Sequence, residues 1–436
     1  MLIPKDENPR DHTVDTDPGV DDVLAILLAL ASPEFEILAI VISFGESEHV
    51  NILKMYQAIA RHLEQFPEDA ARFPNFQQGR KTILAAQYFH GRDGLAGITE
   101  RHSDLDVSSP SPSEHPQLQI TSQPGVEVAL ELIKSEPSRC ITYIALGPLT
   151  NLAKLMRLDR RSTVDRLGRV VCMGGALDVP GNTSPMAEFN FFADPYAVHE
   201  LLCPGGTISG FPLDRFVLLP LDITTPHELS FPLYARYPSR AEDKPPIVHF
   251  ASSFLERTRE VMCEFGKDAL ELHDIVAVWC ALVNPPVPTP DGHGELQSGW
   301  KATRRKFAVE RYGELTRGML VVDRRDDPGA YAPGANRAEV QAALDPSHRA
   351  GTSTLLESNA VPAQVEIELA QAPAANPAAP TPSTVARTGP VVVKPAPASP
   401  HGPPDGVACV TETPGSDALV RLLLSRVFGV ELPAAF

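Results

Sequence analysis

The chain has 436 residues and a formal net charge of −17, a length that holds one large α/β domain or two smaller ones. This negative charge argues against nucleic acid or an anionic membrane surface as a partner. The sequence has no run of about 18 apolar residues that would span a membrane, and residues 1–10 lack the apolar stretch of a signal peptide. The six cysteines show no Cys-x-x-Cys spacing, which favours a reduced cytoplasmic protein.

Alternating segments, taken in chain order, predict a parallel sheet covered by helices. Residues 11–14 are short and polar for a first strand, whereas residues 20–31 have the length and composition of a buried helix. Apolar patterns predict further strands at residues 36–43, 140–146 and 169–173 and further helices at residues 50–66 and 149–158. We therefore expect a single large α/β domain with a mostly parallel central sheet flanked by helices, and ligands beyond the carboxyl ends of the strands.

Two segments interrupt this pattern. Residues 102–119 are polar and rich in Ser and Pro, as expected for a surface excursion. Residues 326–405 contain long Pro/Ala-rich tracts and few aromatic side chains, so they cannot bury enough apolar surface to fold alone. We expect them to be a disordered insertion between a catalytic core at residues 11–325 and the final strand and helix of that core at residues 406–436.

Four aspartates lie directly before the first predicted helix, in residues 15–22 (DTDPGVDD). At an effective dielectric of about 20, each like-charge pair at about 4 Å costs roughly 4 kcal/mol. A helix N-terminus supplies only about half a positive charge, so a bound cation is the better candidate for offsetting the repulsion. Oxygen ligands alone favour Ca²⁺ or Mg²⁺. The segment is predicted to be an active site, rather than one capping Asp with acidic neighbours.

The acidic run resembles the N-terminal signature of the inosine–uridine preferring nucleoside hydrolase family. Further motifs follow in the family's order, at residues 90–95 (HGRDGL), 147–151 (GPLTN), 173–175 (MGG), 181–182 (GN), 188–190 (EFN), 194–195 (DP) and 273–274 (HD). The resemblance extends to about residue 323 and resumes in the final helix. It implies an enzyme that hydrolyses the N-glycosidic bond of nucleosides to base and ribose with bound Ca²⁺, as a homodimer or homotetramer in nucleoside salvage.

By this resemblance the acidic residues divide between binding the ion and activating water. The implied Ca²⁺ ligands are Asp17, Asp22, Asp274 and the main-chain carbonyl of Thr150. Asp21, beside the ion, would be the general base that deprotonates a calcium-bound water, which then attacks the anomeric carbon. Alone, Asp274 is more typical of a helix N-cap, so its role depends on the other motifs.

The resemblance also implies a set of substrate contacts. The residues that would contact the nucleoside are Asp22, His90, Met173, Asn182, Glu188, Asn190, His273 and Asp274. The polar side chains among them would bind ribose hydroxyls, and Met173 would pack on the sugar. His273 and His90 are the candidates for contacting or protonating the departing base. Singly, His90 is more typical of a structural histidine and the asparagines of turns; their joint occurrence favours a site.

The sequence departs from the family pattern at one point and leaves the base open. Glu46 follows Gly45 where the family usually has Asn, an extra carboxylate that would alter affinity. Purine-specific relatives tend to carry Trp before the metal-binding Asp, where this chain has His273. This favours inosine–uridine or pyrimidine nucleosides as substrates.

Two other functions fit parts of the sequence. A catalytically idle, calcium-dependent ribose- or nucleoside-binding protein would explain Glu46, and release of ribose separates it from the enzyme. Asp15-x-Asp17 resembles the nucleophile and acid pair of haloacid-dehalogenase-type phosphatases. That chemistry disfavours the Pro18-Gly19 that follows here and requires a later lysine and acidic pair.

Overall fold

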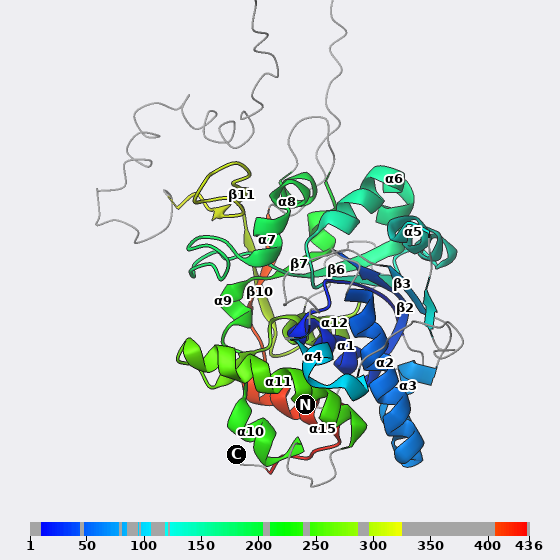
Figure 1. The fold of residues 1–436 in the computed structure, drawn as a ribbon. Helices are drawn as coiled ribbons and strands as arrows, with labels where there is room; N and C mark the ends of the chain where they lie inside the picture. The colour runs from blue at the N-terminus through cyan, green and yellow to red at the C-terminus, as the bar shows by residue number, and fades with distance from the viewer. Residues whose placement is uncertain are drawn as a thin grey trace, which may run out of the picture. The chain divides into compact units, whose positions relative to one another are not determined.

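A computed structural model of the chain has a nine-stranded sheet at its centre (Figure 1). The structure describes residues 10–43, 48–77, 81–84, 95, 97–105, 118–120, 123–203, 210–238, 245–286, 296–324 and 406–433. In spatial order the strands are β10 (Lys301–Arg305), β13 (Val407–Glu412), β7 (Phe216–Leu219), β6 (Leu167–Met173), β5 (Ile141–Ala145), β1 (Arg10–Thr16), β2 (Phe35–Ile42), β3 (Lys81–Leu84) and β4 (Leu118–Ile120). Only the β10–β13 pair is antiparallel among these strands. The predicted mostly parallel sheet is confirmed.

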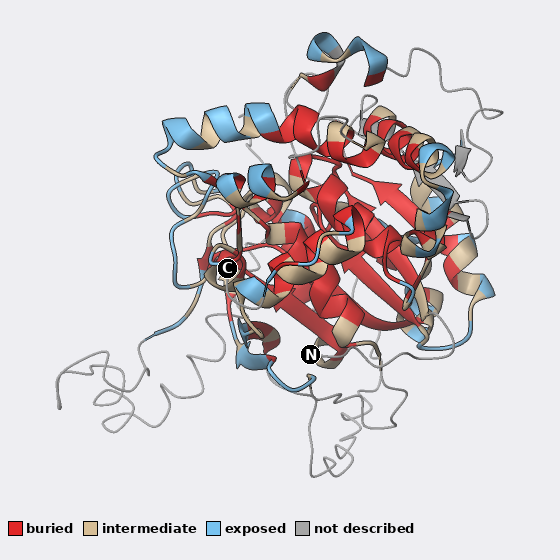
Figure 2. Cartoon of the chain, turned by 90° about the horizontal axis from the view of Figure 1, so that it is seen from below, coloured by how far each residue is buried: buried red, intermediate tan, exposed pale blue. Residues whose placement is uncertain are grey.

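Helices cover both faces of the sheet because successive residues of a strand point to opposite sides. On β5, Ile144 packs in one hydrophobic core and Tyr143 in the other. The first core is covered by α1 (Val20–Leu30), α2 (Glu48–Gln65), α11 (Pro246–Glu264), α12 (His273–Val283) and α15 (Ser416–Phe428). The second is covered by α5 (Gly125–Ser135), α6 (Thr150–Arg166) and α8 (Pro195–Leu202). Figure 2 shows the resulting gradient from buried strands to exposed outer helix faces.

The polar first strand lies in the middle of this sheet, between β5 and β2. His12 is 2% exposed; its ring packs on Phe35 with centroids 3.8 Å apart, and its Nδ1 lies 2.5 Å from the Arg10 carbonyl oxygen. Burial lowers the pKa of His12 to about 3. A neutral imidazole therefore fills a position where an apolar side chain was expected.

The α1 helix fixes where its two N-terminal carboxylates lie. Ten of its eleven residues are buried, as expected for a helix that is apolar on all sides. At its C-terminal end, Asn75 Nδ2 donates to the carbonyls of Ala29 and Ser32, at 3.2 and 2.6 Å. With both ends held, the first turn of α1 is placed at the carboxyl end of β1.

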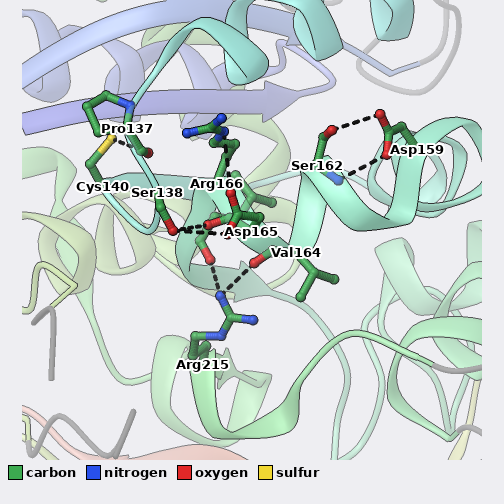
Figure 3. Close-up of polar contacts among 10 residues, drawn as sticks. Pro137, Ser138, Cys140, Asp159, Ser162, Val164, Asp165, Arg166 and Arg215 are labelled. Carbon is green, nitrogen blue, oxygen red and sulfur yellow. Dashed lines mark hydrogen bonds and ion pairs between the residues drawn. The ribbon is translucent and has the colours of Figure 1, made fainter. Parts of the chain in front are cut away.

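At the opposite, N-terminal ends of β5 and β6, polar groups are paired with one another (Figure 3). Ser138 Oγ donates to the Asp165 carbonyl and carboxylate, at 3.0 and 3.1 Å, and Arg215 donates to the Val164 carbonyl at 2.8 Å. The α6 helix before this junction is kinked at Asp159, whose carboxylate accepts from Ser162. The predicted helix at residues 149–158 is therefore only the first part of α6.

Short elements complete the described chain: η1 (Pro67–Arg72), α3 (Pro74–Gln77), α4 (Ile98–Arg101), η2 (Ser103–Leu105), α7 (Phe189–Ala193), η3 (Leu213–Arg215), α9 (Leu221–Thr224), β8 (Glu228–Ser230), α10 (Phe231–Arg236), β9 (Ala269–Glu271), β11 (Ala308–Val309) and β12 (Leu320–Val321). Residues 118 and 119, the end of the expected surface excursion, lie with Ile120 in the edge strand β4 (Leu118–Ile120) instead. No described helix is long and apolar enough to cross a membrane.

The strand and helix expected near the C-terminus are β13 and α15. β13 pairs with β7 and β10, and α15 packs against α1, within a compact unit of Met1–Asp323 and Asp405–Phe436. Residues 326–405 lie outside the described residues, so the disordered insertion stays a prediction.

Candidate active site

Three carboxylates meet where α1 and α12 begin. Asp21 and Asp22 lie in the first turn of α1 and Asp274 in the first turn of α12. One oxygen from each lies within 4.8 Å of the other two. Asp22 and Asp274 are buried and Asp21 is half-buried. Burial, followed by the charges of Asp22, Asp21 and Asp17, raises the pKa of Asp274 well above its usual value. A cation bound among these groups would offset that repulsion.

The segment between β1 and α1 is held so that its carboxylates keep these positions. Thr16 Oγ1 and the Gly19 N–H donate to the two oxygens of Asp22, at 2.5 and 3.1 Å. Asn51 Nδ2 donates to the Pro18 carbonyl at 3.0 Å. Asp22 therefore caps its own helix while presenting its carboxylate to Asp274.

Asp17 closely approaches the turn between β5 and α6. A Cβ on Gly147 would lie 2.7 Å from Asp17 Oδ1, so a side chain at this position would displace the Asp17 carboxylate. Thr150 begins α6 at the same turn, and its Oγ1 donates to Asp194 at 2.5 Å. The first and third predicted motifs are thus adjacent, although 130 residues separate Asp17 from Gly147.

A buried network lies beneath the carboxylates at the end of β1. Asp15 accepts hydrogen bonds from Ser43 Oγ at 2.7 Å, Tyr143 OH at 2.7 Å and Asn151 Nδ2 at 3.0 Å. Asn151 also donates to Ser43 Oγ, at 2.8 Å. Burial raises the pKa of Asp15 to about 6, although these three donors act in the opposite direction. The network joins the carboxyl ends of β1, β2 and β5.

A second group of predicted residues lies at the ends of β5 and β6. Asn190 Nδ2 donates to the carbonyls of Leu146 and Met173, at 2.6 and 3.2 Å. Glu188 is buried and caps α7, accepting from the main-chain N–H groups of Asn190, Phe191 and Gly175, at 2.7, 3.1 and 2.7 Å. Burial raises the pKa of Glu188 even so. Its carboxylate is thus mainly used to shape the loop after β6.

This arrangement matches a known family. A family model described as inosine-uridine preferring nucleoside hydrolase matches residues 13–350. The chain belongs to this family. A Leishmania major protein named inosine-uridine preferring nucleoside hydrolase is 29% identical over 325 residues, covering 73% of this chain and 88% of that protein. A pyrimidine-specific ribonucleoside hydrolase of Salmonella agona is 30% identical over 321 residues, covering 71% and 87%. The prediction of an N-glycosidic bond hydrolase is confirmed at the level of the family.

Solved structures of nucleoside hydrolases share the fold. A plant nucleoside hydrolase covers 97% of this chain and 100% of its own, with a TM-score of 0.57 at 19% identity. A purine-preferring ribonucleoside hydrolase from Gardnerella vaginalis covers 73% of this chain and 90% of its own, with a TM-score of 0.51 at 21% identity. At these identities the likeness concerns the fold alone.

In this family member, His273 is held on both sides of its ring. Nδ1 lies 2.8 Å from Thr224 Oγ1 and Nε2 lies 3.0 Å from Glu271 Oε2. The hydrogen bond from His273 is the main cause that lowers the pKa of Glu271 to about 2. His273 could protonate a departing nucleobase only if one of these contacts opens.

Of the remaining predicted residues, the structure describes only Asn182. Asn182 is exposed, and its Oδ1 accepts from the Phe189 N–H at 3.0 Å, inside its own loop. His90 and Glu46 lie outside the described residues.

The sequence did not predict the supporting role of three residues. Asp15 and Asn151 lie inside two of the predicted motifs, but the hydrogen bonds that Asp15 accepts from Tyr143, Asn151 and Ser43 require β1, β5 and β2 to lie side by side. Asp222, at the start of α9, accepts from the N–H groups of Leu177 and Asp178 at 2.9 and 2.7 Å and so holds the loop after β6. An isolated Asp gives no sequence signal for that contact.

The donor chemistry of the carboxylate cluster fits a hard cation. Asp21, Asp22 and Asp274, with the charge of Asp17 near them, offer only oxygen, which Ca²⁺ and Mg²⁺ prefer. His273, the adjacent imidazole, is turned to Thr224 and Glu271. The cluster is therefore a possible metal-binding group of the kind that the sequence predicted.

Proposed function

We propose that this chain hydrolyses the N-glycosidic bond of ribonucleosides to free base and ribose at the carboxylate cluster. The observation that carries this proposal is the convergence of Asp21, Asp22 and Asp274 within 4.8 Å. Glycoside hydrolysis needs a base for the attacking water and negative charge near the anomeric carbon, which acquires oxocarbenium character. The cluster supplies both.

Asp17, Asp22, Asp274 and the carbonyl of Thr150 would hold Ca²⁺ in this proposal. Bound there, the ion would offset the repulsion among the carboxylates, orient ribose hydroxyls and lower the pKa of a water molecule. Elemental analysis of the purified protein tests the identity of the ion, and we expect one calcium per chain.

Asp21 is the proposed general base. Thr16 and Gly19 hold the Asp22 carboxylate, whereas among the described residues no hydrogen bond holds that of Asp21. Asp21 accepts a proton from water as the water oxygen bonds to C1′. The bond from C1′ to the base nitrogen breaks, and its electron pair leaves with the base.

The loop after β6 would bind the ribose. Because both hydrogens of the Asn190 amide are used by Leu146 and Met173, Asn190 Oδ1 is the atom left to accept a bond from a ribose hydroxyl. Met173 packs on the sugar, while Glu188 and Asn182 contribute mainly by shaping the loop. Of the two histidines predicted to protonate the departing base nitrogen, His273 is the one that the structure describes. It could do so once its contact with Thr224 or Glu271 opens.

A reducing-sugar assay over uridine, cytidine, inosine, guanosine and adenosine tests the proposal. We propose inosine–uridine or pyrimidine preference, because His273 precedes Asp274 and one similar relative is named pyrimidine-specific. Ribose release from uridine or inosine, absent in Asp274→Ala, supports the hydrolase. Nucleoside binding with no release of ribose from any of the five would instead establish the idle binding protein.

We also propose a cytoplasmic homodimer or homotetramer. All six cysteines are free, as a reducing compartment allows. Light scattering after size-exclusion chromatography measures the assembly, and a monomer at micromolar concentration would contradict the proposal.

A further inference from the structure

A cluster of two histidines and one aspartate lies apart from the carboxylate site. One ligand atom each of His102, Asp104 and His249 lies within 4.8 Å of the other two. His102 directly follows α4, Asp104 lies in η2, and His249 lies in the first turn of α11. Both histidines are half-buried and Asp104 is exposed. The cluster shares no residue with the group formed by Asp21, Asp22 and Asp274.

The geometry is close to that of a metal site. His249 Nε2 lies 2.9 Å from Asp104 Oδ2, and the rings of His102 and His249 are 5.5 Å apart, inclined at 81°. Tetrahedral Zn²⁺ has Zn–N distances of about 2.0–2.1 Å, so its ligand atoms lie about 3.3 Å apart. Small side-chain rotations would bring the three donors to that spacing.

The three side chains carry the donor atoms of a metal site. His102 and His249 each offer an imidazole nitrogen and Asp104 a carboxylate oxygen, all within reach of one ion. The ion pair between Asp104 and His249 would not need His102 beside it.

Two hydrogen bonds from arginine side chains to main-chain carbonyls hold the elements that carry the ligands. Arg101 donates to the Ser253 carbonyl of α11 at 3.0 Å. Arg61 of α2 donates to the Asp104 carbonyl at 2.8 Å. The ligands therefore project from segments already fixed against one another, which lowers the cost of ordering them around an ion.

We propose that His102, Asp104 and His249 form a Zn²⁺ site that cross-links the segment at residues 98–105 to α11. Two imidazoles with one carboxylate are borderline-soft donors that favour Zn²⁺ over Ca²⁺. Three protein ligands leave a fourth position for water. The site is independent of the nucleoside chemistry, so it stands or falls separately from the proposed hydrolase.

Zn²⁺ titration of the full-length protein by calorimetry, with Ca²⁺ in excess, tests this site. We expect one Zn²⁺ per chain with a micromolar dissociation constant, weakened at least tenfold in His102→Gln/His249→Gln. Cys140→Ser/Cys263→Ser is the matched control, because it removes two of the partly exposed thiols, and it should bind as the wild type does. No stoichiometric binding, or unchanged affinity in the histidine variant, would overturn the proposal.

Two further measurements separate a metal site from a folding effect. Asp104→Asn keeps a hydrogen-bonding side chain but removes the charge, and it should weaken Zn²⁺ at least tenfold without changing the circular dichroism. Hydrogen exchange at residues 98–105 and in the first turns of α11 should slow with Zn²⁺ in the wild type only. Zn²⁺ binding without slower exchange in both segments contradicts the cross-link.

Discussion

Acidic clusters stand at both ends of β1, and they differ in what surrounds them. At the N-terminal end, Asp11, Glu136 and Cys140 have ligand atoms within 4.8 Å of one another, and all three are half-buried. At the carboxyl end, Asp22 and Asp274 are buried, and two helices begin at the cluster. Beneath them, Tyr143, Asn151 and Ser43 hold Asp15.

The difference shows that grouped carboxylates alone do not make a site. Burial and the charge of Glu136 raise the pKa of Asp11 to about 6, so this cluster can relieve its repulsion by taking up a proton. At the carboxyl end, burial and the neighbouring charges likewise raise the pKa of Asp274, but Thr16 and Gly19 donate to Asp22 and two helix N-termini lie at the cluster. These surroundings favour ionised carboxylates, whose charge a bound cation would offset. Substituting an aspartate at each end of β1 tests this contrast.

The largest expected effect comes from removing β13, which completes the sheet, and α15, which packs against α1. Six side chains of α15 are buried: Leu419, Val420, Leu423, Leu424, Val427 and Phe428. At roughly 1.5–3 kcal/mol each, they contribute about 9–18 kcal/mol, as much as the whole stability of a typical domain. Truncation after residue 405 also removes β13 from between β10 and β7. We expect an insoluble chain or one without a cooperative melting transition.

Deleting residues 328–404 with a short linker is the matched comparison. Changing the length of a flexible loop alters its closure entropy by only about 0.6 kcal/mol per doubling, so this variant should stay soluble and active. If both deletions behave alike, the division of the core around an insertion is wrong.

The next largest effect is on turnover, at the carboxyl end only. Asp21→Asn removes the proposed base and should lower turnover by about 10²–10⁴-fold, with substrate and Ca²⁺ affinity kept because Asp17, Asp22 and Asp274 remain. Asp11→Asn, at the other end of β1, should leave turnover unchanged. Steady-state kinetics with the preferred nucleoside compares the two. Near-normal turnover of Asp21→Asn would remove Asp21 from the mechanism.

Chelation of calcium should have an intermediate effect. A ligand present at 100 times its dissociation constant stabilises the folded state by about 2.7 kcal/mol, so a chelator should lower the melting temperature and added Ca²⁺ should restore it. Asp22→Asn should melt at a lower temperature and lose the response, whereas Asp11→Asn should keep it. An unchanged wild-type melting curve, with no calcium by elemental analysis, would reject the ion.

The sequence predicted the elements with strong apolar periodicity and the residues around the carboxylates. Residues 20–31 and 36–43 correspond closely to α1 and β2, because burial on all sides leaves a continuous apolar run. The motifs at residues 15–22 and 273–274 lie at two helix N-termini that meet, although only the first follows a strand of the central sheet and the second follows β9 of a separate two-stranded sheet.

What the sequence missed depends on neighbours distant in the chain. The polar β1 is central because His12 is neutral and packs on Phe35, which no local pattern shows. The role of Asp15 requires Tyr143 to lie beside it, 128 residues later. The edge strand β4 has only three residues, too few for a periodic signal.

The smallest expected effect is at the N-terminal end of β1 and depends on pH. Because the pKa of Asp11 is about 6 in the folded protein and 3.8 when unperturbed, the folded state binds the proton more tightly, and stability falls as pH rises through this interval. Asp11→Asn removes that loss, so at pH 7.5 it should raise the free energy of unfolding by about 1 kcal/mol once solvent screening is allowed for. At pH 4 the gain should vanish, because Asp11 is then largely protonated in the folded protein. Urea denaturation of both proteins at the two pH values measures the difference. An equal gain at both would mean that packing, and not the charge of Asp11 beside Glu136, separates the variant from the wild type.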